Sequence, residues 1–343
     1  MLNSFLAATS RSVRVLAVPI GLAIGASVWM AQNLAIAQQN DAAPLQLEGK
    51  IPLGAVRGRI DHMAIDLDRH RLFVAELGND SVGVVDLDAR KVVHQLGGLK
   101  EPQGVGYLSS SDTLFVANGG DGSVRLFQGP DYAANGRIDL GDDADNIRVD
   151  QVAKRVIVGY GSGALGVIDA GKRIADIRLS AHPESFQLDP GSNRIYVNVP
   201  NRRAIAVVDP ESGKQTANWP MTIAGANFPM ALDEEARRVL VMFRNPAKLG
   251  VFAMEDGGQV AAMDACGDAD DLFVDAKRHR IYVSCGEGVI DVFDAQTYRR
   301  LARIPTIAGA RTSFFAPEID RFMLAVRATA REPAAIWLFR PVP

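Results

Sequence analysis

Acidic side chains cluster in short polar segments that precede apolar strands along the chain. These segments carry nine carboxylates against two arginines, Arg59 and Arg311. The carboxylates are Asp61, Glu101, Asp142, Asp143, Asp145, Glu184, Asp268, Asp270 and Asp271. Acids that converge on one place attract a cation, and carboxylate oxygens are ligands that hard divalent metal ions accept. The arginines would instead hold a carboxylate group of a ligand.

Four of these acids are the candidate ligands of a divalent metal ion: Asp145, Glu184, Asp270 and Asp271. The same four belong to a wider set of candidate ligand-binding residues that also contains Arg59, His62, Gln103, Asn146, His182 and Arg311. A structural interpretation competes with this one, because Asp or Asn before a strand often accepts backbone N–H bonds from the adjoining loop. His62 and His182 are either ligands or general bases, or loop histidines whose hydrogen bonds are satisfied locally.

The elements that position these segments form an internal repeat. Each repeat has an apolar strand, a polar turn that usually contains Arg, a second apolar strand and a Gly/Asn loop before a third strand. The turn positions are Asp66, Ser110, Asp150, Asp189, Asp233, Asp275 and Pro317, spaced 44, 40, 39, 44, 42 and 42 residues apart. Because a four-stranded propeller blade takes about 40–45 residues, the chain is predicted to be an all-β propeller of seven blades.

The seventh repeat ends at AAIWLFRP without a fourth strand. We expect residues 45–53, LQLEGKIPL, to supply that strand and so to close the ring. Residues 45–343 are therefore predicted to form one propeller domain. The repeated Asp-to-Arg turns, such as Asp150 to Arg155, Asp189 to Arg194 and Asp275 to Arg280, are predicted to be structural because they recur in blade after blade.

The repeat cores FVAE, FVAN, IVGY, YVNV and YVSC, each followed by a loop and then in most repeats by VVD, VID or VFD, resemble those of the YVTN-repeat propellers. The segments GRIDH, EPQG, DDADN, AHPES, NFPMALD and GDADDLF are similar to those of a subgroup of the YncE-like exported proteins. The resemblance covers residues 45–340. It implies a seven-bladed periplasmic propeller and no defined reaction.

The first 37 residues have the composition of a secretory signal peptide. Arg11 and Arg14 precede an apolar run from Val15 to Ala31, and Ala35-Ile36-Ala37 is a small-x-small cleavage site. We expect cleavage after Ala37, a short linker over residues 38–44 and a monomeric periplasmic or secreted protein without a membrane span. An uncleaved membrane anchor is the alternative, although Pro19 interrupts the run.

The charge balance argues against a nucleic-acid partner. The formal charge is −3, and removing two arginines with the signal peptide makes it −5, whereas nucleic-acid binding requires clustered Lys and Arg. The two cysteines, Cys266 and Cys285, flank the first two strands of the sixth repeat, and antiparallel pairing brings them to one end of that blade. An oxidising compartment then favours a disulfide, and a Cu(I)-binding pair is the alternative.

Two classes of function remain open at this stage. The first is a binding module whose acidic axial mouth holds a small molecule or metal ion, or whose surface binds a periplasmic protein. The second is a metal-dependent hydrolase or lactonase with carboxylate ligands at the propeller axis. No nucleophile, base and orienting group can be assembled from the sequence, so catalytic residues are not assigned and the binding module is the preferred prediction.

Overall fold

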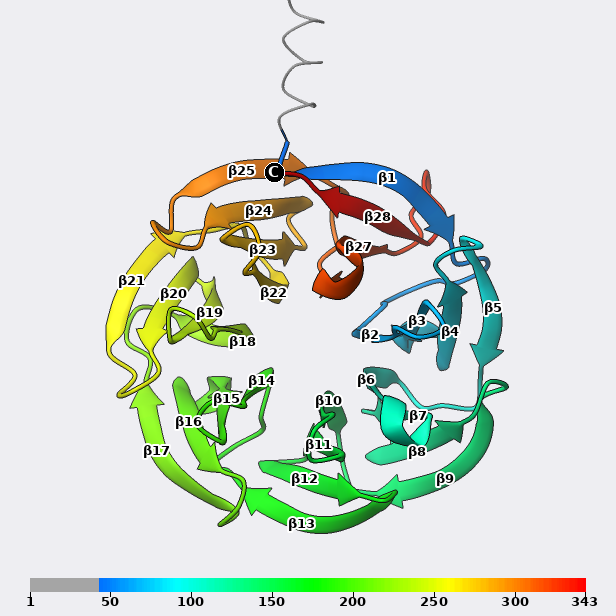
Figure 1. The fold of residues 1–343 in the computed structure, drawn as a ribbon, viewed down its shortest axis with the longest axis horizontal. Coiled ribbons are helices and arrows are strands. Elements are labelled where there is room, and N and C mark those ends of the chain that lie inside the picture. Colours follow the sequence, from blue (N-terminus) through cyan, green and yellow to red (C-terminus); the bar gives the residue numbers. More distant parts are fainter. Residues whose placement is uncertain (1–42) are drawn as a thin grey trace, which may run out of the picture. The chain divides into compact units, whose positions relative to one another are not determined.

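The computed structural model describes residues 43–343 of the chain. The predicted signal peptide and residues 38–42 of the predicted linker lie outside the described residues. Pro44–Pro343 form one compact unit, which is a ring of seven four-stranded antiparallel sheets around a central axis (Figure 1). The predicted seven-bladed, all-β propeller is confirmed. No helix in residues 43–343 is long and apolar enough to cross a membrane.

Blades 1 to 4 follow one another along the chain, and each is numbered from its innermost strand outward. Blade 1 contains β2 (Met63–Asp66), β3 (Arg71–Glu76), β4 (Ser81–Asp86) and β5 (Lys91–Leu96). Blade 2 contains β6 (Pro102–Leu108), β7 (Thr113–Asn118), β8 (Ser123–Gln128) and β9 (Ala133–Asp139). Blade 3 contains β10 (Ala144–Asp150), β11 (Arg155–Tyr160), β12 (Ala164–Asp169) and β13 (Lys172–Arg178). Blade 4 contains β14 (Phe186–Asp189), β15 (Arg194–Val199), β16 (Ala204–Asp209) and β17 (Lys214–Pro220).

Blades 5 to 7 complete the ring. Blade 5 contains β18 (Gly225–Asp233), β19 (Arg238–Asn245), β20 (Ala247–Ala253) and β21 (Gln259–Asp264). Blade 6 contains β22 (Ala269–Asp275), β23 (Arg280–Cys285), β24 (Val289–Asp294) and β25 (Arg300–Pro305). Blade 7 contains β26 (Ser313–Ala316), β27 (Arg321–Val326), β28 (Ala335–Pro341) and β1 (Leu45–Pro52). Single 3-10 turns are η1 (Leu77–Asn79), η2 (Ser109–Ser111), η3 (Pro200–Arg202) and η4 (Pro317–Ile319).

The N-terminal strand closes the ring, as the missing fourth strand of the seventh repeat predicts. β1 pairs antiparallel with β28 from Leu45 opposite Pro341 to Pro52 opposite Ala335. Two segments almost 300 residues apart in sequence therefore share one blade, with blue β1 beside red β28 in Figure 1. This pairing covers a sheet edge that would otherwise be open between the first and last blades.

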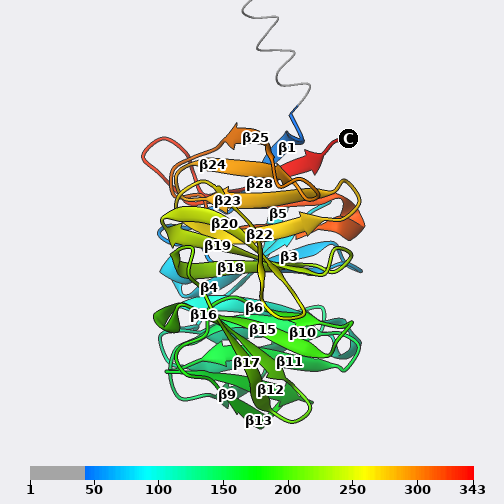
Figure 2. The ribbon, with the colours of Figure 1, turned by 90° about the vertical axis from the view of Figure 1, so that its left-hand side faces the viewer.

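The core consists of apolar layers between the faces of neighbouring blades. The ring centroid of Phe73 in β3, for example, lies 5.5 Å from that of Tyr107 in β6 and 5.5 Å from that of Tyr132, and both tyrosines belong to blade 2. Such layers follow from the sequence, because the central strands carry Val, Ile, Leu and Phe on both faces and each face needs a neighbouring blade to bury it. The strands cross the thickness of the ring, as the edge-on view shows (Figure 2).

The turn after each innermost strand lies on the face opposite the polar segments that precede it. There Asp150 accepts N–H bonds from Val152 and Ala153 at 3.0 and 2.8 Å. Asp189 likewise accepts one from Gly191 at 3.0 Å, and Asp275 one from Arg278 at 3.2 Å. Carboxylates bound to their own turns stabilise the turns, which confirms the structural interpretation of these residues.

Candidate functional site

The polar segments that precede the innermost strands meet at the ring axis, where they line a cavity of about 260 Å³ that we call the axial pocket. All of the predicted ligand-binding residues except Asp271 line it: Arg59, His62, Gln103, Asp145, Asn146, His182, Glu184, Asp270 and Arg311. The remaining lining residues are Asp61, Asp143, Ser185, Phe228 and Arg244.

Irregular strand pairing orients these side chains. The register of β10 with β11 shifts across Asp145 and Asn146, and the register of β22 with β23 shifts across Asp270. The register of β6 with β7 shifts across Gln103 in the same way. A β-bulge bends a strand and redirects its side chains, so the same irregularity at one end of several innermost strands places their polar groups in the axial pocket.

Part of the acidity of the pocket is neutralised within the protein. Asp270 lies 2.5 Å from Arg244 Nη2 and 3.0 Å from Arg311 Nε, and Asp61 lies 2.7 Å from Arg59 Nη2. Burial by itself would raise the pKa of Asp270, but Arg311 and Arg244 hold that pKa below its ordinary value. Asp270 is therefore a charged member of ion pairs, whereas burial raises the pKa of Asp61 although His62 and Arg59 oppose the effect. The arginines that contact these two acids are not free to bind a second carboxylate at full strength.

Asp145 and Glu184 differ from the paired acids. Among residues 43–343 neither side-chain carboxyl group has a hydrogen-bond or ion-pair partner, and both line the pocket. Burial raises the pKa of Asp145 to about 7, with the neighbouring acids adding to the effect. Burial and the charge of Asp270 raise the pKa of Glu184 to about 7. The side-chain Oδ1 of Asn146, a residue that is only 2% exposed, is also buried without a donor. The pocket thus holds one buried acceptor without a donor, Asn146 Oδ1, and two carboxyl groups that no group in the described part of the chain pairs with.

The two histidines line the same pocket although they belong to distant blades. His62 stands between two acids, with Nε2 at 3.8 Å from Asp61 and Nδ1 at 3.8 Å from Asp271. His182 Nδ1 is 2.6 Å from the carbonyl oxygen of Gly161, a distance at which the ring donates its Nδ1–H to that carbonyl. His182 is therefore held by the loop between β11 and β12, and it also contributes to the pocket wall.

Three of the four predicted metal ligands, Asp145, Glu184 and Asp270, line the axial pocket, and the fourth does not. Asp271 lies outside the axial pocket, where its Oδ2 accepts the backbone N–H of Ser313 at 2.7 Å. Within residues 43–343, no group of three or more His, Cys, Asp or Glu side chains is placed to hold a metal ion. The bulge that directs Asp270 into the pocket turns Asp271, the next residue, toward blade 7, because consecutive strand residues point to opposite sides.

Cys266 and Cys285 form a disulfide, with their Cα atoms 5.9 Å apart. The segment between Cys266 and β22 carries Asp268, whose backbone oxygen accepts the N–H of Gly286 at 2.8 Å. Asp268 in turn contacts Arg311 Nη1 at 2.6 Å. The disulfide therefore ties down the segment that leads to Asp270.

Arg244 is a pocket residue that was not among the predicted ligand-binding residues. It is the residue before the last of β19, and its guanidinium lies 4.1 Å from the ring centroid of Phe228 and donates to the carbonyl oxygen of Ala269 at 2.9 Å. The loops between the second and third strands share the face of the axial pocket. The sequence did contain a signal for Arg244, because a charged residue stands near the end of an otherwise apolar second strand, on the face that carries the axial pocket.

Comparison with known proteins supports the fold. No protein-family model matches the chain, and no curated protein matches it. A solved chain of Kuenenia stuttgartiensis hydrazine synthase superimposes with a TM-score of 0.73 at 17% identity, over 85% of this chain and 99% of that chain. At this level of identity the likeness shows the shared propeller fold, and the function rests on the axial pocket itself.

Proposed function

We propose that this protein is a binding module whose axial pocket holds a small, polar organic cation with an amine group. The observation that carries this proposal is that Asp145 and Glu184 line the pocket without any partner in the described part of the chain. Buried polar groups normally have hydrogen-bond partners, and a ligand that supplies several N–H donors would satisfy both carboxylates and Asn146 Oδ1 together.

Charge also favours a cation over an anion. The pocket arginines Arg59, Arg244 and Arg311 are already paired with Asp61 or Asp270, whereas Asp145 and Glu184 have no counter-charge within bonding distance. Ionising both acids in this partly buried site is unfavourable in the free protein, which is why their pKa values are raised. A bound ammonium group removes that penalty, so the binding energy includes the ionisation of the site.

The test is calorimetric titration with matched pairs of ligands that differ in charge. Putrescine is compared with butanediol, and glucosamine with glucose, on the wild type and on the Glu184→Gln and Asp145→Asn variants. A hydrogen bond to a charged group contributes about 1.5–3 kcal/mol. We therefore expect each variant to bind the amine about ten- to a hundredfold more weakly.

Glu211→Gln is the matched control, because Glu211 is exposed on the turn after β16, away from the axial pocket. This variant should bind the amines as the wild type does. Equal affinity for the charged and uncharged member of each pair would contradict the proposal.

We also propose that the protein acts in the periplasm or outside the cell, as a member of the YVTN-repeat propellers. The basic and apolar N-terminal residues, the Ala35-Ile36-Ala37 site and the repeat cores support this, and so does the Cys266–Cys285 disulfide, which is stable in an oxidising compartment. N-terminal sequencing of the protein from a periplasmic extract should begin at Gln38. Recovery of an uncleaved chain in the membrane fraction would contradict the proposal.

A further inference from the structure

A second cavity lies on the axis, beyond the axial pocket, and has a volume of about 530 Å³. We call it the central channel. The innermost strands of all seven blades line it, and His62 is the residue it shares with the axial pocket. Gln151, Glu234 and Glu318, which are exposed and follow the innermost strands, mark its opening on the opposite face. The volume falls within the range of about 300–1,000 Å³ that small-molecule sites occupy.

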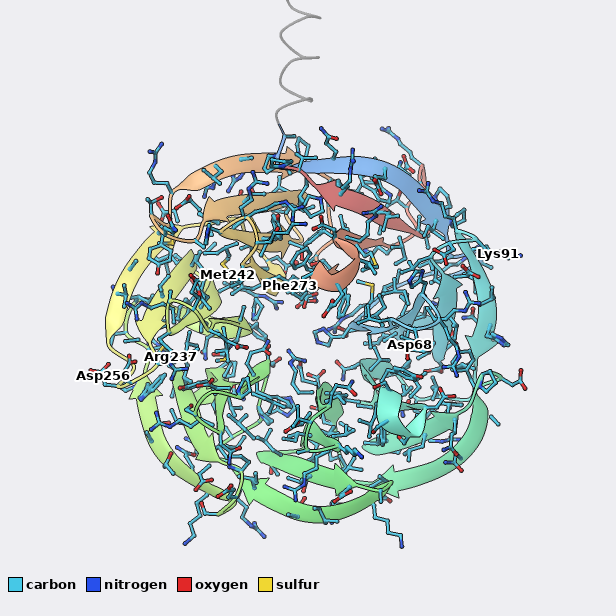
Figure 3. The ribbon with its side chains drawn as sticks, viewed as in Figure 1. Asp68, Lys91, Arg237, Met242, Asp256 and Phe273 are labelled. Carbon is cyan, nitrogen blue, oxygen red and sulfur yellow. A yellow bond between two sulfur atoms is a disulfide. The ribbon has the colours of Figure 1, made fainter. Side chains whose placement is uncertain are left out.

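The walls of the central channel are about half apolar, and most of the apolar side chains come from the innermost strands. The larger apolar side chains among the lining residues include Ile65, Val105, Ile147, Val149, Leu188, Leu232, Leu272, Phe273, Val274 and Phe314, and the polar ones include Tyr107, Arg148, Gln187, Asp271 and Ser313. Phe273 is labelled at the inner edge of blade 6 in Figure 3, and its ring lies 6.2 Å from that of Phe314 in blade 7. Walls that combine apolar side chains with a few polar groups suit a ligand with an apolar body and one polar end.

One cationic side chain, Arg148 of β10, stands in this wall. Its guanidinium donates only to neutral acceptors: Ile147 O at 2.7 Å, Ser185 Oγ at 3.1 Å and Gln187 Oε1 at 3.4 Å. No Asp or Glu in residues 43–343 forms an ion pair with Arg148. A buried charge without a counter-ion costs free energy, and Arg remains charged at any physiological pH.

Asp271 and Asp145 attract Arg148 electrostatically, but neither forms an ion pair with it. Burial and the charge of Asp270 raise the pKa of Asp271 well above its ordinary value, and its Oδ2 is occupied by the N–H of Ser313. Glu234 and Glu318 are exposed at the opening. Burial lowers the pKa of Arg148, although the charges of Asp271 and Asp145 act in the opposite direction.

We infer that the central channel binds a monocarboxylic acid with an apolar body, whose carboxylate pairs with Arg148 and whose body packs against the apolar side chains of the walls. The guanidinium has N–H groups beyond the three used within the protein, and its planar fork suits a carboxylate. This site is separate from the axial pocket, and the inference does not depend on the amine ligand proposed there.

Calorimetric titration of the mature protein with octanoate tests the inference, with octanamide as the uncharged ligand of the same shape. Arg148→Gln removes the charge and keeps hydrogen-bonding capacity toward Ser185 and Gln187. We expect saturable octanoate binding to the wild type, at least tenfold weaker binding to Arg148→Gln, and the same weak octanamide binding to both. Arg178→Gln, at an exposed position on β13, is the matched control and should bind octanoate as the wild type does.

Glu184→Gln separates the two sites, because it should weaken amine binding in the axial pocket and leave octanoate binding unchanged. A second measurement uses only the wild type: the carboxyl carbon of labelled octanoate, followed by NMR, should titrate at a lower pKa when bound than when free. Unchanged octanoate affinity in Arg148→Gln, absence of saturable binding to the folded wild type, or an unshifted pKa of the bound acid would each overturn the inference.

Discussion

Replacing Glu184 by Gln should stabilise the ligand-free protein at alkaline pH, because the wild type pays for ionising a carboxyl group that has no partner. The ordinary pKa of a glutamate side chain is 4.5, and burial raises the pKa of Glu184 in the folded protein to about 7. The folded state therefore holds this proton more tightly than the unfolded state, so the contribution of Glu184 to stability is lost as pH rises from about 4.5 to about 7.

The size of the effect follows from that difference in pKa. Each tenfold difference in the acidity constant corresponds to about 1.4 kcal/mol, which gives a loss of roughly 2–3 kcal/mol in the wild type between pH 5 and pH 8. Because solvent that enters the pocket would screen the charge of Glu184, we take about 1 kcal/mol as the lower end of the expected loss of stability. Gln cannot ionise, and it also removes a charge that raises the pKa of Asp145.

Urea unfolding of both proteins at pH 5 and pH 8 measures the effect. We expect a small difference in the free energy of unfolding at pH 5, and at pH 8 a variant that is more stable by about 1–3 kcal/mol. Glu211→Gln, on an exposed turn, should show no such gain at either pH. The same difference between variant and wild type at both pH values would refute the reasoning, because it would mean that Glu184 ionises without penalty.

Two further substitutions test how the site is supported. Replacing Cys266 and Cys285 by Ser opens a loop whose ends are 19 residues apart, and it should lower the free energy of unfolding by about 3 kcal/mol. Urea unfolding measures this change. An unchanged urea concentration at the unfolding midpoint would show that the disulfide does not stabilise the protein. In Gly104→Ala, the new Cβ would overlap the carbonyl oxygen of Asp145, so the substitution should lower the free energy of unfolding, measured by thermal unfolding, by about 1–3 kcal/mol. The control Gly97→Ala should change this free energy very little, because there is open space around its Cβ. Equal effects of the two Gly substitutions would contradict the close packing of β6 against β10.

The fold could be predicted from the sequence because it is repeated seven times. A single degenerate repeat is ambiguous, but turn positions spaced about 42 residues apart define the blades together. The absent fourth strand in the last repeat also indicated that residues 45–53 would close the ring, and β1 occupies Leu45–Pro52. The pattern of apolar residues along the strands and the turn-forming residues between them were sufficient to predict the blades and the closure of the ring.

The composition of the axial pocket was predictable, and its charge pairing was not. Sequence position placed Asp145 and Asp270 in the same part of their repeats, yet Asp270 has two arginine partners from neighbouring blades and Asp145 has none. Which arginine reaches which acid depends on the geometry of the whole ring. Asp271 was assigned to the same site as Asp270 because a one-residue bulge, which reverses the direction of a side chain, leaves no clear sequence signal.

The most direct test of the central claim is calorimetric titration of putrescine at pH 7 in two buffers with different ionisation enthalpies, such as phosphate and Tris. Asp145 and Glu184 are each about half protonated at that pH, since both pKa values are about 7. Binding of an ammonium group should release up to about one proton per protein, and Glu184→Gln should release less. Absence of binding, or binding whose heat is the same in both buffers, would contradict the account.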